Sequence, residues 1–529
     1  MRNFHNPGRS AIHATNGVVS SSHPLATQAG LEILKEGGNA IDAAIATCAV
    51  QCVVEPQSTG IGGDCFAIIA PQGSSDLVAF NGSGKAPAGI TVEKGRATDG
   101  DSLGHQSPHS ITVPGAIDGW AQLLKDHGTM GFDRVLRSAI DYAENGYVVH
   151  GRVAFDWAGM VDILSNTKNA SDVYLKDGRS YQEGEIHKQP ALGKTLRAIA
   201  EGGRDAFYKG DIAEDMVSYL QGIGGVHTMD DFADAVGEYV ETIRTDYRGY
   251  TLHEIPPNGH GMVALEMLNI LDGFDDKDKD PLSFERLHHQ IEAARIGYGD
   301  RDRFTADPKF ADVPLDRLLS KEYAAEQRAR ISDEKALGPQ YDDVMDTNAD
   351  TVYITVVDKD RNAVSFINSI FHPFGSGHVT DTGVLLHNRG MSFRLDDSHP
   401  NKIEGGKRPM HTIIPAMVTK DDKAQMCFGV MGGHYQPQGQ AHVLTNMLDY
   451  GMDMQTALDT PRVFADPDGP VDVEQGIPED VVAKLEAVGN TINRIKTPHG
   501  GGQGIWINWE SGVLTGGSEP RKDGCAIGY

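Results

Sequence analysis

The sequence predicts an α+β fold, because its helix-forming and strand-forming segments are concentrated in different parts of the chain. Between residues 116 and 300, apolar residues recur mainly at helical spacing. From residue 351 onward, runs rich in β-branched residues alternate with turn-forming stretches, as expected for strands. Blocks of helices followed by blocks of strands are typical of this class.

The composition is that of a soluble globular protein: 529 residues, 39% hydrophobic and 23% charged. The 47 basic and 74 acidic residues give a formal charge of −27, which argues against nucleic acid or anionic membranes as partners. No apolar run approaches the roughly 20 residues that span a bilayer. The first ten residues lack a hydrophobic signal core, and the five cysteines show no Cys-x-x-Cys spacing. We therefore expect a cytoplasmic protein with reduced thiols.

The first elements follow from local patterns. We expect a strand at 14–20, a helix at 25–35 and a second helix at 40–54, followed by a strand at 65–70. The helix at 40–54 is apolar nearly all round, which predicts burial on every face. It ends at Glu55, which precedes a proline.

Two motifs suggest ligands that we reject. The glycines in 60–63 resemble a phosphate-binding loop, but here a helix precedes the turn and a strand follows, the reverse of a nucleotide fingerprint. His288, His289 and Glu292 share a helix face, yet no third ligand motif accompanies them, so a structural role is expected. We predict neither a metal nor a cofactor.

The remaining elements are assigned by the same rules. Helices are expected at 116–125, 134–144, 192–201, 211–222, 263–271, 441–450 and 478–487. Strands are expected at 351–357, 363–368, 383–386, 412–418 and 426–430.

The stretch around Thr351 carries the functional information. Thr351 follows a polar lead-in and opens a β-rich run, and by itself it is an ordinary strand start. The full pattern, Thr-x-x-x-[Ser/Thr]-Val-Val-Asp-Lys-Asp-x-Asn-Ala-Val-Ser with Phe-Gly-Ser-Gly at 374–377, resembles the start of the small subunit of the γ-glutamyltranspeptidase family. Further matches at 39–44, 59–63, 256–261 and 523–529 extend this resemblance over nearly the whole chain.

The resemblance implies both a fold and a processing event. The fold would be the four-layer αββα sandwich of N-terminal-nucleophile (Ntn) hydrolases, with two antiparallel sheets. Self-cleavage between Asp350 and Thr351 would give a large subunit, 1–350, and a small subunit, 351–529, intertwined in one domain. The two products would form a heterodimer, and further pairing into a homo-oligomer is left open.

Cleavage would explain how a threonine becomes reactive. A hydroxyl is a poor nucleophile without an adjacent base. Once the bond before Thr351 is cut, its own α-amine, with a pKa near ~7.7–8.0, can serve as that base. This fits a chain that has no Gly-x-Ser-x-Gly elbow and no metalloprotease helix.

The resemblance also implies partners for the nucleophile. The hydroxyl that orients it falls on Ser369, eighteen residues after Thr351. The oxyanion-binding glycines fall on Gly432 and Gly433, for which the alternative is a tight turn after the strand at 426–430.

The residues that grip a γ-glutamyl group in this family are largely replaced. Ser83 stands for an arginine, Phe371 for an asparagine, Ser392 for an acidic residue, and His411 with Thr412 for a serine pair. Losing a buried cation and a buried anion weakens glutamate recognition by several kcal/mol.

One cation is gained at Arg389, whose forked guanidinium suits a carboxylate. His411 and His434 could add donors. An ordinary structural arginine and two packed histidines are the alternatives.

The sequence therefore predicts an Ntn amidohydrolase that cleaves a small carboxylate-bearing amide such as oxamate through an acyl-enzyme on Thr351. Three alternatives remain: a γ-glutamyl hydrolase or transpeptidase acting on glutathione or related amides, a cephalosporin-type acylase, and an uncleaved binding protein of the same fold.

Overall fold

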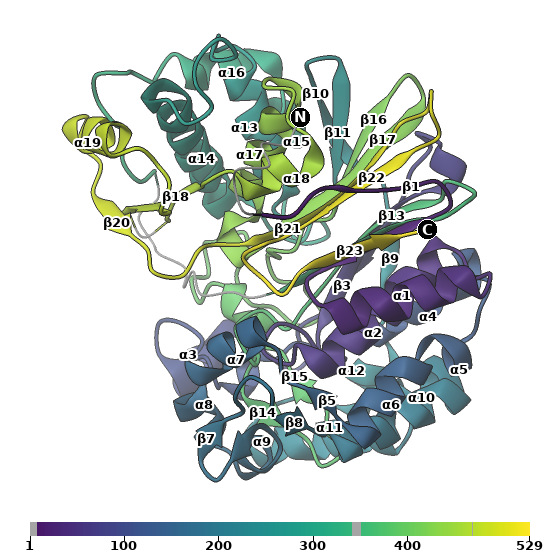
Figure 1. Cartoon of the computed structure of the whole chain (residues 1–529). Coiled ribbons are helices and arrows are strands. Elements are labelled where there is room, and N and C mark those ends of the chain that lie inside the picture. Colours follow the sequence, from purple (N-terminus) through teal and green to yellow (C-terminus); the bar gives the residue numbers. More distant parts are fainter. Residues whose placement is uncertain (1–7, 341–350, 468) are drawn as a thin grey trace.

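The computed structural model describes residues 8–340, 351–467 and 469–529, which form four layers in the order helices, sheet, sheet, helices (Figure 1). Both large sheets of the described residues have seven strands, and all their pairings are antiparallel. The predicted α+β class and the sandwich of two antiparallel sheets are confirmed.

The first sheet has the strand order β23-β2-β12-β13-β3-β4-β9. Its members are β2 (Val18–Ser21), β3 (Asp64–Ala70), β4 (Val78–Gly82), β9 (Glu238–Val240), β12 (Val352–Val357), β13 (Ala363–Ser369) and β23 (Cys525–Gly528). The central strands β3, β12 and β13 are buried along their whole length, as their apolar sequences require.

The second sheet has the order β1-β22-β21-β17-β16-β11-β10. Its members are β1 (Ile12–Ala14), β10 (Ile243–Tyr247), β11 (Tyr250–Glu254), β16 (Ala416–Lys420), β17 (Lys423–Met431), β21 (Gly501–Ile507) and β22 (Leu514–Ser518). The two sheets meet in an apolar layer to which Phe66, Ile367, Met417 and Ile505 contribute.

Helices cover the outer faces. On the first sheet pack α1 (Pro24–Lys35), α2 (Ala40–Val54) and α4 (Ala116–His127), and outside them lie α6 (Arg137–Asn145), on α2, and α10 (Pro190–Tyr208), on α4 and α6. On the second sheet pack α13 (Gly261–Leu271), α17 (Gln436–Leu448) and α18 (Met454–Asp459), and α14 (Phe284–Phe304) packs on α13 and α17. Helix α2 is buried at every position and starts at a capping box of Asn39 and Asp42.

Shorter elements complete the described chain. The remaining helices are α3 (Val92–Asp99), α5 (Phe132–Val135), α7 (Gly151–Ala158), α8 (Val161–Ser165), α9 (Lys168–Tyr174), α11 (Asp211–Gly222), α12 (Met229–Ala233), α15 (Leu315–Leu318), α16 (Lys321–Arg328) and α19 (Glu479–Ala487). Small ribbons are formed by β5 (Tyr147–Val148) with β8 (Ile186–His187), β6 (Leu175–Lys176) with β7 (Arg179–Ser180), β14 (His378–Val379) with β15 (Leu385–Leu386), and β18 (Val463–Ala465) with β19 (Val471–Val473) and β20 (Ile492–Arg494).

Most predicted elements are present, with four differences. The strand expected at 412–418 begins only at Ala416, as β16. The strand expected at 14–20 is interrupted by a bend between β1 and β2, which belong to different sheets. The helix expected at 134–144 is two consecutive helices, α5 and α6. The segment 238–254, taken as part of a mainly helical middle, instead supplies β9, β10 and β11.

Candidate active site

The proposed nucleophile lies where the two central strands of the first sheet end. Thr351 directly precedes β12, and Ser369 is the last residue of β13, which pairs with β12. Both residues are buried, and their hydroxyl oxygens are 3.1 Å apart. The N–H of Phe371 donates to Ser369 Oγ at 2.9 Å, which fixes the serine side chain beside Thr351.

Strands β12 and β17 face each other across the two sheets. Thr355 Oγ1 donates to Cys427 Sγ at 2.8 Å, and the ring of Tyr353 fills the space that a side chain at Gly429 would need. Thr355 therefore lies opposite Cys427, and Tyr353 lies opposite Gly429. Moving two residues toward the N-terminus of β12 corresponds to moving two residues toward the C-terminus of β17. This register brings Thr351 level with the end of β17.

The two predicted oxyanion glycines follow β17 directly. Gly432 and Gly433 have φ values of 122° and 54°, a backbone conformation that favours glycine. A Cβ on Gly432 would lie 2.7 Å from Gly500 Cα, so the turn also requires a close backbone approach. Gly432 and Gly433 thus form a tight turn. Because this turn follows the end of β17, its two backbone N–H groups lie at the Thr351 end of the sheets.

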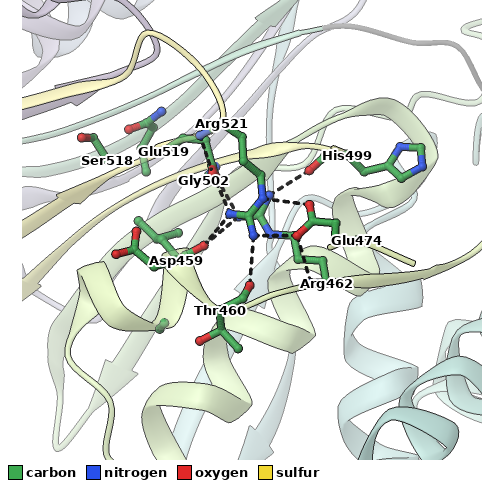
Figure 2. Close-up of polar contacts among 12 residues, drawn as sticks. Asp459, Thr460, Arg462, Glu474, His499, Gly502, Ser518, Glu519 and Arg521 are labelled. Atoms are coloured by element: carbon green, nitrogen blue, oxygen red, sulfur yellow. Dashed lines mark hydrogen bonds and ion pairs between the residues drawn. The ribbon is translucent and has the colours of Figure 1, made fainter. Parts of the chain in front are cut away.

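A buried ion network holds the segment on which this turn packs (Figure 2). Glu519 accepts from Arg462 at 2.6 Å, from Arg521 at 2.9 Å and from the N–H of Gly502 at 2.7 Å. Glu474 accepts from Arg521 at 2.7 Å. Burial would raise the pKa of Glu519, but the two arginines and the Gly502 N–H outweigh it and hold that pKa at about 2. Two cations and two anions thereby fix the start of β21.

Arg389 is buried beside Ser369, with 1% of its surface exposed. Its Nη1 donates to Thr412 Oγ1 at 2.8 Å, and its Nη2 lies 3.5 Å from Ser369 Oγ. Its guanidinium carbon sits 4.0 Å from the ring centre of Phe371. Burial lowers the pKa of Arg389 to about 9, which leaves the guanidinium charged at neutral pH.

The charge of Arg389 has no carboxylate partner within ion-pair distance among the described residues, and its Nε makes no hydrogen bond to them. On the same short helix, η3 (Arg389–Ser392), the buried Ser392 hydroxyl also lacks a partner among them. Buried polar groups are normally paired. These two are therefore placed to receive groups from a ligand.

Asp64 lies behind this cluster and was not predicted as a site residue. Its carboxylate accepts from the N–H groups of Gly84 at 2.9 Å and Gly115 at 3.1 Å, and His411 Nε2 lies 3.0 Å away. Burial favours the neutral acid, but His387, His411 and Arg389 outweigh it and hold the pKa of Asp64 at about 2. In the sequence, its position directly after the glycine turn 60–63 is a feature that could have identified Asp64 as a site residue.

His411, His434 and Ser83 each have a hydrogen-bond partner within the described residues. His411 faces Asp64, and burial followed by the nearby Arg389 lowers its pKa to about 3, which keeps it neutral. His434 Nδ1 lies 2.6 Å from Arg301 Nη1. Ser83 bonds to Asn81 at 2.6 Å and lines a different cavity of about 360 Å³. Asp350, the residue before the predicted cleavage, lies outside the described residues.

A larger cavity of about 750 Å³ reaches the cluster at Phe371. Besides Phe371, its walls include His372, Met391, Phe393 and Arg394, whereas Thr351 and Arg389 are not among them. The hydroxyls of Thr351 and Ser369 are therefore buried and do not line this cavity.

The residues considered for metal binding are engaged with other side chains or with the backbone. His289 contacts Asp276 at 2.7 Å and Asp333 at 2.9 Å through its two ring nitrogens, and Arg295 donates to Glu292 at 2.7 Å. Within the described ranges, no group of three or more metal-ligating side chains occurs, and no helix is long and apolar enough to cross a bilayer.

Comparison with known proteins extends over the whole chain. The family model described as Gamma-glutamyltranspeptidase matches residues 26–529. The glutathione hydrolase-like YwrD proenzyme of Bacillus subtilis is 38% identical over 98% of this chain and 99% of that protein. The oxamate amidohydrolase proenzyme of Klebsiella pneumoniae is 32% identical over 98% and 99%. The crystal structure of cephalosporin acylase from Bacillus halodurans is 41% identical, with a TM-score of 0.93 over 100% and 99% of the two chains.

Proposed function

The chain belongs to the γ-glutamyltranspeptidase family of hydrolases and acyltransferases, and on that premise we propose that it is a self-processing amidohydrolase for small carboxylate-bearing amides such as oxamate. Hydrolysis of the bond between Asp350 and Thr351 would leave Thr351 at the start of the small subunit. The large and small subunits would then remain together as the active heterodimer.

The proposed reaction assigns a group of this chain to each step. The α-amine of Thr351 would take the hydroxyl proton as Oγ1 attacks the amide carbon. The resulting oxyanion would accept from the N–H groups of Gly432 and Gly433, and such donors are worth about 3–4 kcal/mol each. The amine would return the proton to the leaving ammonia, and water would then hydrolyse the ester on Thr351.

The buried guanidinium of Arg389 carries the substrate proposal. Ser369 Oγ contacts both Thr351 Oγ1 and Arg389 Nη2, so two hydrogen-bond lengths separate nucleophile and cation. That span suits a carboxylate attached directly to the attacked carbonyl, as in oxamate. The α-carboxylate of a γ-glutamyl group lies three carbons further along and needs a longer pocket.

The substrate proposal is tested by comparing two released products on one enzyme preparation. Ammonia release from oxamate is expected to exceed p-nitroaniline release from γ-glutamyl-p-nitroanilide by at least ~100-fold in kcat/KM, which corresponds to ~3 kcal/mol of lost glutamyl recognition. Comparable turnover of the γ-glutamyl compound would overturn the oxamate assignment.

Processing is tested separately by denaturing electrophoresis. Cleavage before Thr351 divides the 529 residues into pieces of 350 and 529 − 350 = 179 residues. Thr351→Ala is expected to remain one band and to be inactive, while Thr351→Ser keeps a hydroxyl and is the matched control. A cleaved or active Thr351→Ala protein would refute the nucleophile, and an uncleaved active wild type would refute processing.

Cephalosporin-type acylase activity is the second candidate. Two observations favour it: the close structural likeness to the Bacillus halodurans protein, and the cavity of about 750 Å³ beside Phe371. That volume falls within the range that holds drug-sized ligands. Release of the β-lactam nucleus from a glutaryl-substituted cephalosporin, measured beside oxamate turnover, decides between the two.

A further inference from the structure

We infer that Phe371 is a specificity-determining residue that divides one long acyl pocket into two, and so limits the substrate's acyl group to a short one. The inference rests on the proposed role of Arg389 as the carboxylate site. Phe371 contacts both the buried cation and the cavity: its ring covers Arg389, with 4.0 Å from ring centre to guanidinium carbon, and it also lines the cavity of about 750 Å³.

The Phe371 ring lies between Arg389, which it covers, and the cavity, which it lines. Arg389 is not among the residues that line the cavity, although Met391, two positions later on the same short helix η3, is. Phe371 is 2% exposed, so little of its surface is left open. We expect removal of its ring to open the guanidinium to the cavity.

The space behind this partition far exceeds what oxamate requires. At about 750 Å³, it is many times the roughly 30 Å³ that one water occupies in the liquid. Phe371, Met391 and Phe393 line it together with two arginines and two aspartates, Arg96, Arg394, Asp101 and Asp396. An acyl chain of several methylenes would fit there with its carboxylate on Arg389.

The backbone at Phe371 suggests the cleanest substitution. Phe371 has φ 75°, a left-handed conformation that costs a residue with a Cβ of order 1–3 kcal/mol and suits glycine. Its N–H, which donates to Ser369 Oγ, is retained in Phe371→Gly. This variant therefore removes the ring while keeping the contact that positions the catalytic serine.

The test uses four amides that all release ammonia and differ only in acyl length: oxamate, malonamate, succinamate and glutaramate. The wild-type enzyme is expected to prefer oxamate, with kcat/KM falling along the series. Phe371→Gly is expected to raise the glutaramate-to-oxamate ratio at least 10-fold, and Phe371→Leu, which keeps an apolar side chain, less. Phe393→Ala enlarges the same cavity but keeps the Phe371 ring over Arg389, and is expected to leave the ratio unchanged.

Two outcomes overturn the inference: an unchanged ratio in Phe371→Gly that still turns over oxamate, or an equal shift in Phe393→Ala. Calorimetric titration of oxalate and glutarate into Thr351→Ala, with and without Phe371→Gly, keeps it testable if no amide is hydrolysed. Glutarate binding gained only with Phe371→Gly supports the partition, even where the absence of turnover has removed the proposed function. If neither oxalate nor glutarate binds, Arg389 is not a carboxylate site and the inference is overturned.

Discussion

At the scale of single residues, the site is defined by a cation and a hydroxyl pair that share one contact atom. Ser369 Oγ is 3.1 Å from Thr351 Oγ1 and 3.5 Å from Arg389 Nη2. A guanidinium buried without an adjacent carboxylate costs free energy in the ligand-free protein. Asp64 offsets this cost only from a distance, so a carboxylate bound next to Arg389 would stabilise the guanidinium further.

Arg389→Gln is expected to raise KM for oxamate and to lower kcat/KM about 30-fold or more, because removing one partner of a buried charge pair costs about 2–5 kcal/mol. Arg389→Lys keeps the charge but loses the forked geometry, so an intermediate loss is expected. Steady-state kinetics with oxamate measure both. Arg408, which is equally buried but pairs with Glu238 at 2.6 Å, is the control: Arg408→Gln should leave KM unchanged. A normal KM in Arg389→Gln would exclude it as the carboxylate site.

At the scale of elements, sequence patterns predicted the helices and strands whose limits are set by neighbouring residues in the chain. Helix α2 has the predicted limits, because its apolar run is bounded by a capping box and a proline. Strand β10 was missed because it is an edge strand that buries only alternate residues, so its polar sequence gave little signal.

Contacts between distant segments were the harder part of the site to predict. Asp64 and His411 are 347 positions apart, and only the pairing of the sheets shows that they touch. Ser83 and His434 were selected by position in a family pattern, and the structure gives them contacts with Asn81 and Arg301. The residues joined to Thr351 follow from a single hairpin, β12–β13, which the sequence does encode.

The ion network beside the glycine turn supports a prediction at the element scale. Glu519→Gln leaves two buried arginines with one full anionic partner, and breaking a buried pair costs about 3–5 kcal/mol. Because Gly432 packs against Gly500 next to the network, we also expect kcat for oxamate to fall more than KM rises. Thermal melting and steady-state kinetics measure the two effects.

Glu479→Gln provides the matched control for this network. Glu479 pairs with Arg494 on the surface, with a side chain 79% exposed, and such pairs contribute about 0–1 kcal/mol. If Glu519→Gln melts at the temperature of Glu479→Gln and keeps its kcat, the network does not position the glycine turn.

At the scale of the whole molecule, the two proposed subunits are interleaved strand by strand. In the first sheet, β2 of the large subunit lies between β23 and β12 of the small one, and β13 pairs with β3. In the second sheet, β22 pairs with β1 and β16 with β11. Cleavage before Thr351 would therefore cut the chain without dividing the fold (Figure 1).

This interleaving predicts that neither product folds alone. Residues 1–350 expressed without the rest would leave unpaired strand edges and an open apolar face between the sheets, and they should aggregate. The processed enzyme should run as one species in native size-exclusion chromatography and separate only in denaturant. A monodisperse, thermally cooperative 1–350 fragment would contradict the single-domain assignment.

Buried histidines give the whole molecule a predictable sensitivity to acid. Burial lowers the pKa values of His187, His227 and His253 to about 4 and that of His411, also affected by Arg389, to about 3, against about 6.5 in an unfolded chain. Between the folded-state and unfolded-state pKa values, these histidines are protonated in the unfolded chain but neutral in the folded protein. The free energy of unfolding therefore falls as the pH drops from 6.5 toward 4.

Each such histidine changes the free energy of unfolding by at most about 1.4 kcal/mol per pH unit between pH 6.5 and 4. Above pH 6.5 it adds nothing to the pH dependence. The contribution of these histidines to the melting temperature should therefore be level between pH 7 and 8 and decline from pH 6.5 to 5, while Glu254 and Glu266, whose pKa values burial raises, contribute with the opposite sign. His187, which contacts Tyr147 and the Val173 carbonyl away from the active site, isolates the effect: His187→Gln should flatten the decline, whereas the same change at exposed His13 should not. A melting temperature that stays constant from pH 7 to 5 would show that these imidazoles take up protons in the folded protein, and that burial does not hold them neutral.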